Sequence, residues 1–220
     1  IIVEALRTLQ QAVCEVTLSI TVNPDTVDHL TEIVGWAHDD MNVTNIAFNI
    51  IGGQSYEFLG SPMPREEYES RVAENLVKAF QEARRLGMYE DRVGRKVLDF
   101  IEGNFRAVDC GAVNNQLVVL PNGSVSFCHA SDNYIVGSVH DPEFVIYDKP
   151  EIKRWKESLP LYNHNCQDCP AISICGYGCF HHVLELDGDL TQLDHPSCQQ
   201  TKRIMEFLVW DLYNQTNSYF

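Results

Sequence analysis

Seven of the eight cysteines in this 220-residue chain lie at residue 110 or beyond. With one glycine between the first two, their order is Cys110, Gly123, Cys128, Cys166, Cys169, Cys175, Cys179 and Cys198. Thiolates a few residues apart in a loop can bind one metal centre together, and iron–sulfur clusters are held by cysteines in such loops. Gly176 and Gly178 would let the backbone turn tightly around the neighbouring thiols. This spacing predicts a thiolate-bound metal domain.

The intervals between the cysteines divide them into two groups. The four-cysteine group is close in sequence except for its last member and consists of Cys166, Cys169, Cys175 and Cys198. The three-cysteine group consists of Cys110, Cys128 and Cys179. Its first two members bracket a predicted hairpin, and its third lies just beyond the four-cysteine loop, where it can face a second centre. We therefore expect four protein ligands for one cluster and three for the other.

Three other uses of these thiols stay open on spacing alone. Structural zinc is the first, because a Cys-x2-Cys pair is typical of zinc sites and all-cysteine tetrahedral sites are common. A histidine could complete a second zinc site, the candidates being His129, His164, His181, His182 and His195. Disulfides are the second, although seven cysteines leave one unpaired. Reduced, buried thiols are the third.

The cysteine run resembles the SPASM domain, the twin-cluster C-terminal extension of radical S-adenosylmethionine (SAM) enzymes that mature peptides and sulfatases. That family has Cys, nine to fifteen residues, Gly, four residues, Cys, then Cys-x2-Cys-x5-Cys-x3-Cys and a last Cys, and every interval here agrees. Residues 118–125 resemble its strand–turn–strand, and residues 135–139 its following Gly-containing segment. The resemblance covers about residues 105–213. It implies that the four-cysteine group holds a distal auxiliary 4Fe–4S cluster and the three-cysteine group a substrate-side one.

The first half of the chain has the periodicity of alternating helices and strands. Helical spacing over 1–13 and 26–38 alternates with strand patterns over 15–22 and 43–51, and such units form parallel sheets. Long helices are predicted over 65–86 and 89–101, the first with Gly87 at its end. The strands resemble the last steps of the radical SAM partial (β/α) barrel. The sequence departs from that family in lacking the Cys-x3-Cys-x2-Cys loop that binds the SAM-cleaving cluster.

The predicted fold class is therefore α/β, with the C-terminal part of a radical SAM partial barrel followed by a loop-rich SPASM domain. We place the domains at 1–104 and 105–220. In the second domain we expect a hairpin of 116–120 with 124–127, a helix over 151–159, a loop over 163–179, and a helix over 199–213. That last helix should turn Ile204, Leu208 and Leu212 inward. Residues 1–9 are typical of a helix already under way, so we expect further sequence upstream.

Several other residues have side chains that could bind metal or take part in catalysis. Cys14, just before a strand, is expected to be a free, buried thiol, and Trp155 a core residue. His129 follows Cys128, and the anaerobic sulfatase maturases, which this segment resembles, carry a proton-accepting Asp at that position. A histidine there could also accept a proton, so His129 is a weak candidate for catalysis. An ordinary loop histidine is the competing interpretation. Those maturases also have a Cys where this chain has Asn104, so we expect the fourth iron of the second cluster to lack a cysteine ligand from this segment. The alternative is that Cys14, or a histidine such as His129 or His181, is its fourth ligand.

Composition limits the partners. The formal net charge of −15 repels nucleic-acid phosphates and anionic membranes, and no apolar run approaches the ~18 residues of a membrane helix. We expect a cytoplasmic protein whose partners are a peptide or protein substrate and a reductant such as ferredoxin or flavodoxin. The resemblance implies that an intact parent, with SAM and a third 4Fe–4S cluster, makes a 5′-deoxyadenosyl radical that modifies the substrate oxidatively, as in the maturation of ribosomally made peptides. The alternative is a zinc-stabilised peptide-binding module without redox chemistry.

Overall fold

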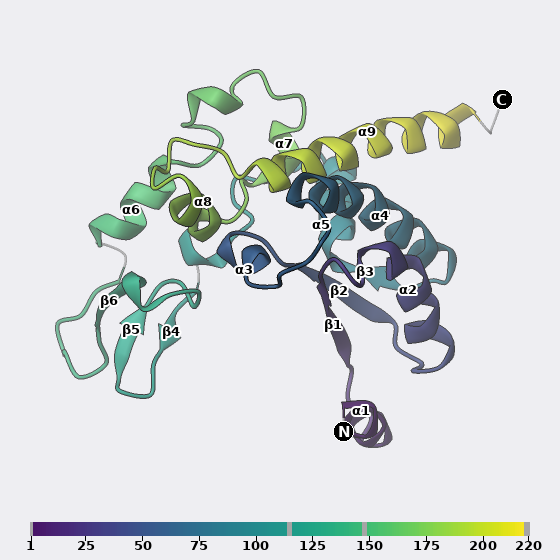
Figure 1. Ribbon diagram of the computed structural model, residues 1–220, viewed down its shortest axis with the longest axis horizontal. Coiled ribbons are helices and arrows are strands. Elements are labelled where there is room, and N and C mark those ends of the chain that lie inside the picture. The colour runs from purple at the N-terminus through teal and green to yellow at the C-terminus, as the bar shows by residue number, and fades with distance from the viewer. Residues whose placement is uncertain (1, 114–115, 147–148, 218–220) are drawn as a thin grey trace. The chain divides into compact units, whose positions relative to one another are not determined.

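The computed structural model describes residues 2–113, 116–146 and 149–217 (Figure 1). Its contacts separate two compact units, one of residues 1–104 with 199–220 and the other of residues 105–198. The last helix thus groups with the first unit, whereas the sequence predicts that it belongs to a second domain of residues 105–220. The reason is side-chain packing. Phe207 meets Phe80 edge-on at 5.9 Å between ring centroids, and Arg84 binds Asp211 at 2.7 Å.

The first unit is built on a three-stranded parallel sheet. Its strands are β1 (Thr17–Val22), β2 (Asn45–Ile50) and β3 (Tyr89–Glu90), in the order β1-β2-β3. Thr17 pairs with Asn45 and Val22 with Ile50, so the predicted parallel pairing of the first two strands is confirmed. The third strand was missed, because two residues at the start of a helical pattern carry no detectable alternation. Whether this sheet is part of a radical SAM barrel stays a prediction.

Helices cover this sheet and supply its core. They are α1 (Ile2–Gln11), the 3-10 turn η1 (Val27–His29), α2 (Leu30–Asp39), α3 (Gln54–Glu57), α4 (Arg65–Arg85), α5 (Asp91–Glu102) and most of α9 (His195–Asn217). α4 packs on α2 and buries Tyr68, Leu76 and Phe80 along one stripe, and Gly87 follows it with a φ of 73°. The Glu90 carboxylate accepts hydrogen bonds from the Arg92 and Val93 amides and so caps α5.

Three expectations for this unit are wrong. Helical spacing over residues 1–13 predicts one face of Ile2, Leu6, Leu9 and Val13. Only Leu6 is buried, while Ile2 and Val13 are 80% and 92% exposed. Cys14 is exposed rather than buried. On α9, Ile204 and Leu208 are buried but Leu212 is 49% exposed. These expectations rested on local patterns, which do not show whether a side chain meets a packing partner in the fold.

The second unit combines a small antiparallel sheet with short helices. β4 (Val118–Val119) and β5 (Ser124–Ser126) form the predicted hairpin, and β6 (Ile135–Ser138) pairs with β5. Gly123 turns with a φ of 82°, and a Cβ there would lie 2.6 Å from His140 Nε2. The helices are η2 (Gly111–Val113), η3 (Asp132–Tyr134), α6 (Pro150–Glu157), η4 (His164–Cys166), α7 (Ile172–Cys175) and α8 (Phe180–Leu186).

The predicted helix after Pro150 is confirmed as α6. The segment 163–179 was expected to be loop, and it holds one turn each of η4 and α7 between its loops. α8 was not predicted, since its seven residues are too few to show a clear period. No helix among the described residues combines the length and the apolarity needed to cross a bilayer.

Candidate metal centres

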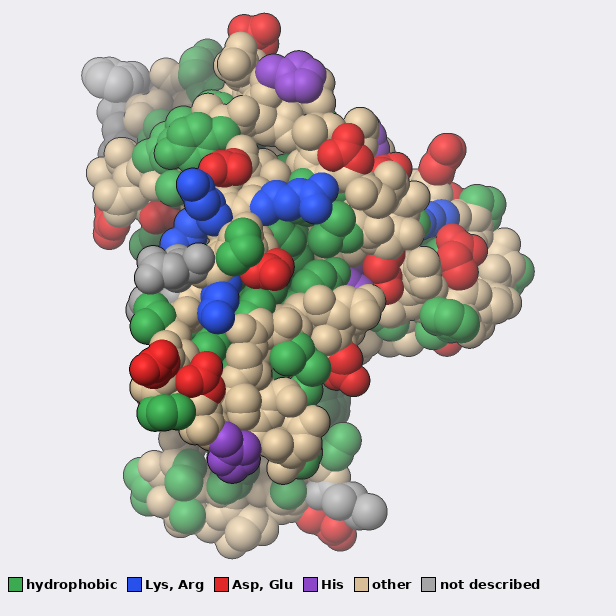
Figure 2. Space-filling model, turned by 90° about the vertical axis from the view of Figure 1, so that its left-hand side faces the viewer, with side chains coloured by type: hydrophobic (Ala, Val, Ile, Leu, Met, Phe, Trp, Pro, Cys, Tyr) green, Lys and Arg blue, Asp and Glu red, His purple; other side chains and the backbone are tan. Residues whose placement is uncertain are grey.

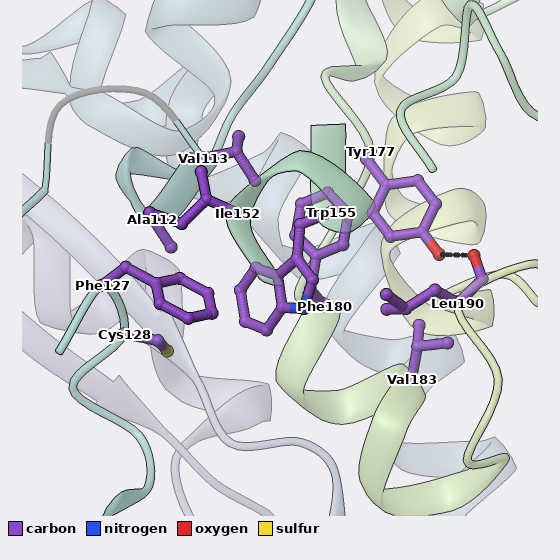
Figure 3. Close-up of a cluster of buried hydrophobic side chains, with 10 residues drawn as sticks. All are labelled: Ala112, Val113, Phe127, Cys128, Ile152, Trp155, Tyr177, Phe180, Val183 and Leu190. Atoms are coloured by element: carbon purple, nitrogen blue, oxygen red, sulfur yellow. Dashed lines mark hydrogen bonds between the residues drawn. The ribbon is translucent and has the colours of Figure 1, made fainter. Parts of the chain in front are cut away.

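The core of the second unit contains a column of aromatic rings, with Cys128 among the buried residues of the same cluster (Figure 3). Trp155 of α6 stacks on Phe180 with 4.9 Å between centroids and 17° between planes. Phe180 stacks in turn on Tyr177 at 4.6 Å and 25°. Tyr134 meets Trp155 edge-on at 5.1 Å. Trp155 and Phe180 are 3% and 0% exposed, so the expectation that Trp155 is a core residue is confirmed.

The three-cysteine group lies together at the Tyr134 end of this column. Burial raises the pKa of Cys128, and the nearby Cys110 thiol raises it further. Burial likewise raises the pKa of Cys179 to about 12, with a smaller contribution of the same sign from Cys110. Tyr134 is close enough to Cys128 and Cys179 that, after burial, they are the next causes of its raised pKa of about 12. The fold therefore brings thiols from residues 110 to 179 into one neighbourhood, although no three of the described side chains surround a single metal ion.

Members of the four-cysteine group lie around Tyr177 at the other end of the column. Cys175 Sγ approaches the Tyr177 carbonyl oxygen at 3.5 Å. Cys166 and Cys198 are near enough to the Tyr177 hydroxyl to raise its pKa, after burial and Asp194. Cys169 is tied to Cys166 by a turn in which its amide donates to the Cys166 carbonyl at 3.1 Å. Tyr177 itself is fixed by a 2.7 Å hydrogen bond from its hydroxyl to the Gln192 carbonyl.

Asp194 joins the two groups, and sequence reasoning missed it. Its carboxylate is buried and accepts hydrogen bonds from the Cys179 amide at 2.7 Å and from the Ser197 hydroxyl at 2.8 Å. Its own carbonyl accepts from the Cys198 amide at 2.9 Å. One residue thus positions a cysteine from each group. An aspartate four residues before the last cysteine was the available sequence signal, but its burial and its partners are known only from the fold.

The chain before Cys110 is fastened directly onto the Cys175 loop. Arg106 donates its amide to the Ser173 carbonyl at 2.8 Å, and Asp109 donates to the Gly176 carbonyl at 2.9 Å. The Ala112 amide lies 3.5 Å from Cys110 Sγ as a donor. Hydrogen bonds of this kind to sulfur tune the potential of a bound cluster.

Replacing Gly176 by alanine should destabilise this junction. Gly176 has a φ of 66°, and an added Cβ would lie 2.6 Å from the Asp109 amide nitrogen and 2.9 Å from the Val108 carbonyl carbon. The left-handed backbone alone costs alanine roughly 1–2 kcal/mol, and the backbone clash adds to that. We expect a lower melting temperature and a lower bound-iron content, measured by calorimetry and iron assay.

Gly188→Ala is the matched control for that change. Gly188 has nearly the same φ, 67°, but nothing lies within 4 Å of its added Cβ. It should therefore show the backbone cost alone and keep its iron. Equal destabilisation in both variants would contradict the packing account of Gly176.

The histidines have varied surroundings. His129 is exposed, and Gln116 Nε2 lies 3.5 Å from its Nδ1, so its proposed catalytic role stays a prediction. His181 accepts from or donates to the Tyr134 hydroxyl at 2.9 Å and pairs with Glu185 at 3.1 Å. His182 lies 3.9 Å from Asp194. His164 opens η4, and His195 opens α9. Within residues 2–113, 116–146 and 149–217, no three His, Cys, Asp or Glu side chains are arranged around one metal ion.

A comparison with protein families places residues 110–170 in SPASM, an iron-sulfur cluster-binding domain. The resemblance seen in the sequence is thereby confirmed for this segment, and the chain carries an iron–sulfur cluster-binding domain of that kind. The matched residues include Cys110, Cys128, Cys166 and Cys169, while the remaining three cysteines of the two groups follow them. No curated protein matches the chain.

Proposed function

We propose that this chain is the auxiliary-cluster part of a radical SAM enzyme that modifies a peptide or protein, a maturase of ribosomally made peptides or of sulfatases. The observation that carries the proposal is that thiols lie near both ends of one aromatic column. Residues 110–170 of the same unit match an iron–sulfur cluster-binding domain. SPASM domains occur in radical SAM enzymes, which supports an enzyme as the parent.

The donor set fits two 4Fe–4S clusters. The three-cysteine group would hold one cluster near Tyr134, and the four-cysteine group the other near Tyr177. Clusters so held store and pass single electrons, at potentials set by ligation, burial and hydrogen bonds to sulfur. The ligands must be thiolates, so the raised pKa values of Cys110, Cys128 and Cys179, caused first by burial, mean that protons leave these side chains on loading.

The rest of the unit holds these ligands in place. The aromatic column packs the centre of the unit, and Asp194 fixes the loops of Cys179 and Cys198. In the intact enzyme SAM and a third cluster would generate the radical, and this part would contact the peptide near the radical site and remove an electron from it. A ferredoxin or flavodoxin would exchange electrons with the protein.

The proposal predicts coloured, iron-loaded protein. Anaerobically purified chain should be brown, with broad visible absorbance and equal amounts of iron and acid-labile sulfide, because the thiols bind clusters rather than single ions. Elemental analysis and visible spectroscopy make the measurement. Colourless protein with stoichiometric zinc would contradict it and would favour the zinc-stabilised peptide-binding module.

A further inference from the structure

α6 carries a stripe of lysines on a protein that is otherwise strongly acidic. Lys149, Lys153 and Lys156 are spaced i, i+4 and i+7, which places them along one side of the helix. Together with Arg154, they supply four of the sixteen basic residues of a chain whose net charge is −15. On the face drawn in Figure 2, lysine and arginine side chains gather in one region.

The lysine stripe has no close ion pairs, although α6 also carries Glu151 and Glu157. No carboxylate of the described residues lies within ion-pair distance of Lys149, Lys153 or Lys156. Lys149 Nζ instead lies 5.1 Å from the centre of the Phe144 ring. Lys153 is exposed and the other two are half-buried. Most other exposed arginines have an acidic partner, as Arg71 has in Asp28 and Arg85 in Glu82.

The side of the same helix that adjoins the lysine stripe faces the aromatic column. Ile152 and Trp155 are 5% and 3% exposed, and Trp155 stacks on Phe180 at 4.9 Å. Phe180 follows Cys179 in the chain and stacks on Tyr177, the residue around which the four-cysteine group lies. The lysine stripe is therefore separated from both cysteine groups by one helix and a continuous ring stack.

We propose that the lysine stripe of α6 is the docking surface for an acidic one-electron carrier protein. The charge of the stripe fits such a partner, because complementary charges steer association and set the encounter rate. The packing of the buried side of α6 against the aromatic column favours an electron carrier over a peptide. Electron transfer needs a packed path from the surface to the thiols, whereas peptide binding does not. The inference rests on the proposed function, since it requires clusters at the cysteines.

The redox balance of the docked complex is simple. One electron leaves the reduced carrier and enters one iron–sulfur centre of this protein, so the carrier is oxidised and the centre is reduced. No covalent bond forms or breaks, and the aromatic side chains keep their own electrons. The reverse transfer, from a reduced centre to an oxidised carrier, uses the same surface.

Charge reversal of the stripe tests the proposal. In the anaerobically loaded full chain, Lys149→Glu, Lys153→Glu and Lys156→Glu together should slow reduction by a plant-type ferredoxin about 10- to 100-fold at low ionic strength. The measurement is stopped-flow loss of visible cluster absorbance. The difference should shrink toward 1 M salt, where the screening length falls to roughly 3 Å.

The control variant carries Arg7→Glu, Lys78→Glu and Lys202→Glu. These residues are exposed, lie in the other unit, and change the net charge by the same amount. The control should be slowed much less than the stripe variant, because its general repulsion of the carrier is equal but its stripe is intact. Should the glutamate variant lose iron on purification, Lys149→Gln, Lys153→Gln and Lys156→Gln together should still slow the ferredoxin reaction severalfold.

A small electron donor distinguishes failure of the docking surface from failure of the proposed function. Photoreduced 5-deazariboflavin, which is uncharged and needs no docking surface, should reduce all the variants at one rate. Absence of any cluster absorbance would overturn the proposed function and this inference with it. Normal reduction by deazaflavin with equal ferredoxin rates in wild type and stripe variants would overturn the docking surface alone. The docking surface would also be overturned if the stripe variants kept the wild-type rate with ferredoxin but bound an acidic peptide more weakly.

Discussion

Cys169→Ala should lose one cluster and keep the other, so that iron and sulfide content falls by about half. The reason is that Cys169 turns back on Cys166, which lies near Tyr177, while Cys128 and Cys179 lie near Tyr134. The loss should also destabilise the cysteine unit, because ligation is part of folding when the site does not exist in the unfolded chain. We expect its melting temperature to fall by more than the ~4–8 °C that 1 kcal/mol produces in a domain of this size.

The grouping makes the outcome specific. Cys175→Ala and Cys198→Ala should leave the same residual electron paramagnetic resonance signal as Cys169→Ala, and Cys179→Ala should leave a different one. Cys14→Ala is the matched control, since Cys14 is exposed, lies in the other unit, and should affect neither iron nor stability. An unchanged iron content in Cys169→Ala, or a lower one in Cys14→Ala, would contradict the assignment.

The elements that the sequence predicts well are those whose signal is local. The alternation over residues 17–22 and 45–50 and the length of α4 are visible in the chain itself, as is the Asn-Gly turn before β5. The cysteine intervals are equally local, and they led to the domain that the family comparison found. β3 and α8 were missed because two and seven residues are too few to establish a period.

The parts that could not be predicted depend on which surfaces meet. Asp194 bonds to Cys179 and Ser197 only once the loops have folded around the aromatic column. Likewise, the apolar spacing of α1 does not tell that Ile2 and Val13 lack a neighbour to pack against. The same limit applies to α9, which follows the last cysteine but packs on α4 through Phe207 and Asp211. Contacts between distant segments depend on three-dimensional packing, and the periodic patterns of a single sequence do not reveal them.

Removing the iron should unfold the cysteine unit selectively. Its helices α6, α7 and α8 have eight, four and seven residues, which is below the ~12–15 residues at which isolated helices become even marginally stable. Its strands have two, three and four residues. Such elements depend on tertiary contacts, and the core that supplies those contacts includes Cys128 and has Cys110 packed against it.

The first unit has no such dependence. The 21-residue α4 packs on α2, and its Tyr68 and Leu76, at 1% and 0% exposed, pack with the sheet and helices of that unit. Its only cysteine is the exposed Cys14. Loss of iron therefore removes no interaction that holds this unit together.

Hydrogen exchange read by mass spectrometry measures the difference. After anaerobic treatment with a strong iron chelator, peptides from residues 105–113, 116–146 and 149–198 should lose most of their protection, because local opening no longer has to break cluster ligation. Peptides from 65–85 should keep theirs, as the internal control on the same molecule. Equal loss in both units would mean that the two fold together, and retained protection around Tyr177 and Phe180 would mean that the aromatic column is stable without metal. Either result would sink the view that ligation holds the cysteine unit, and only protection lost from that unit alone supports it.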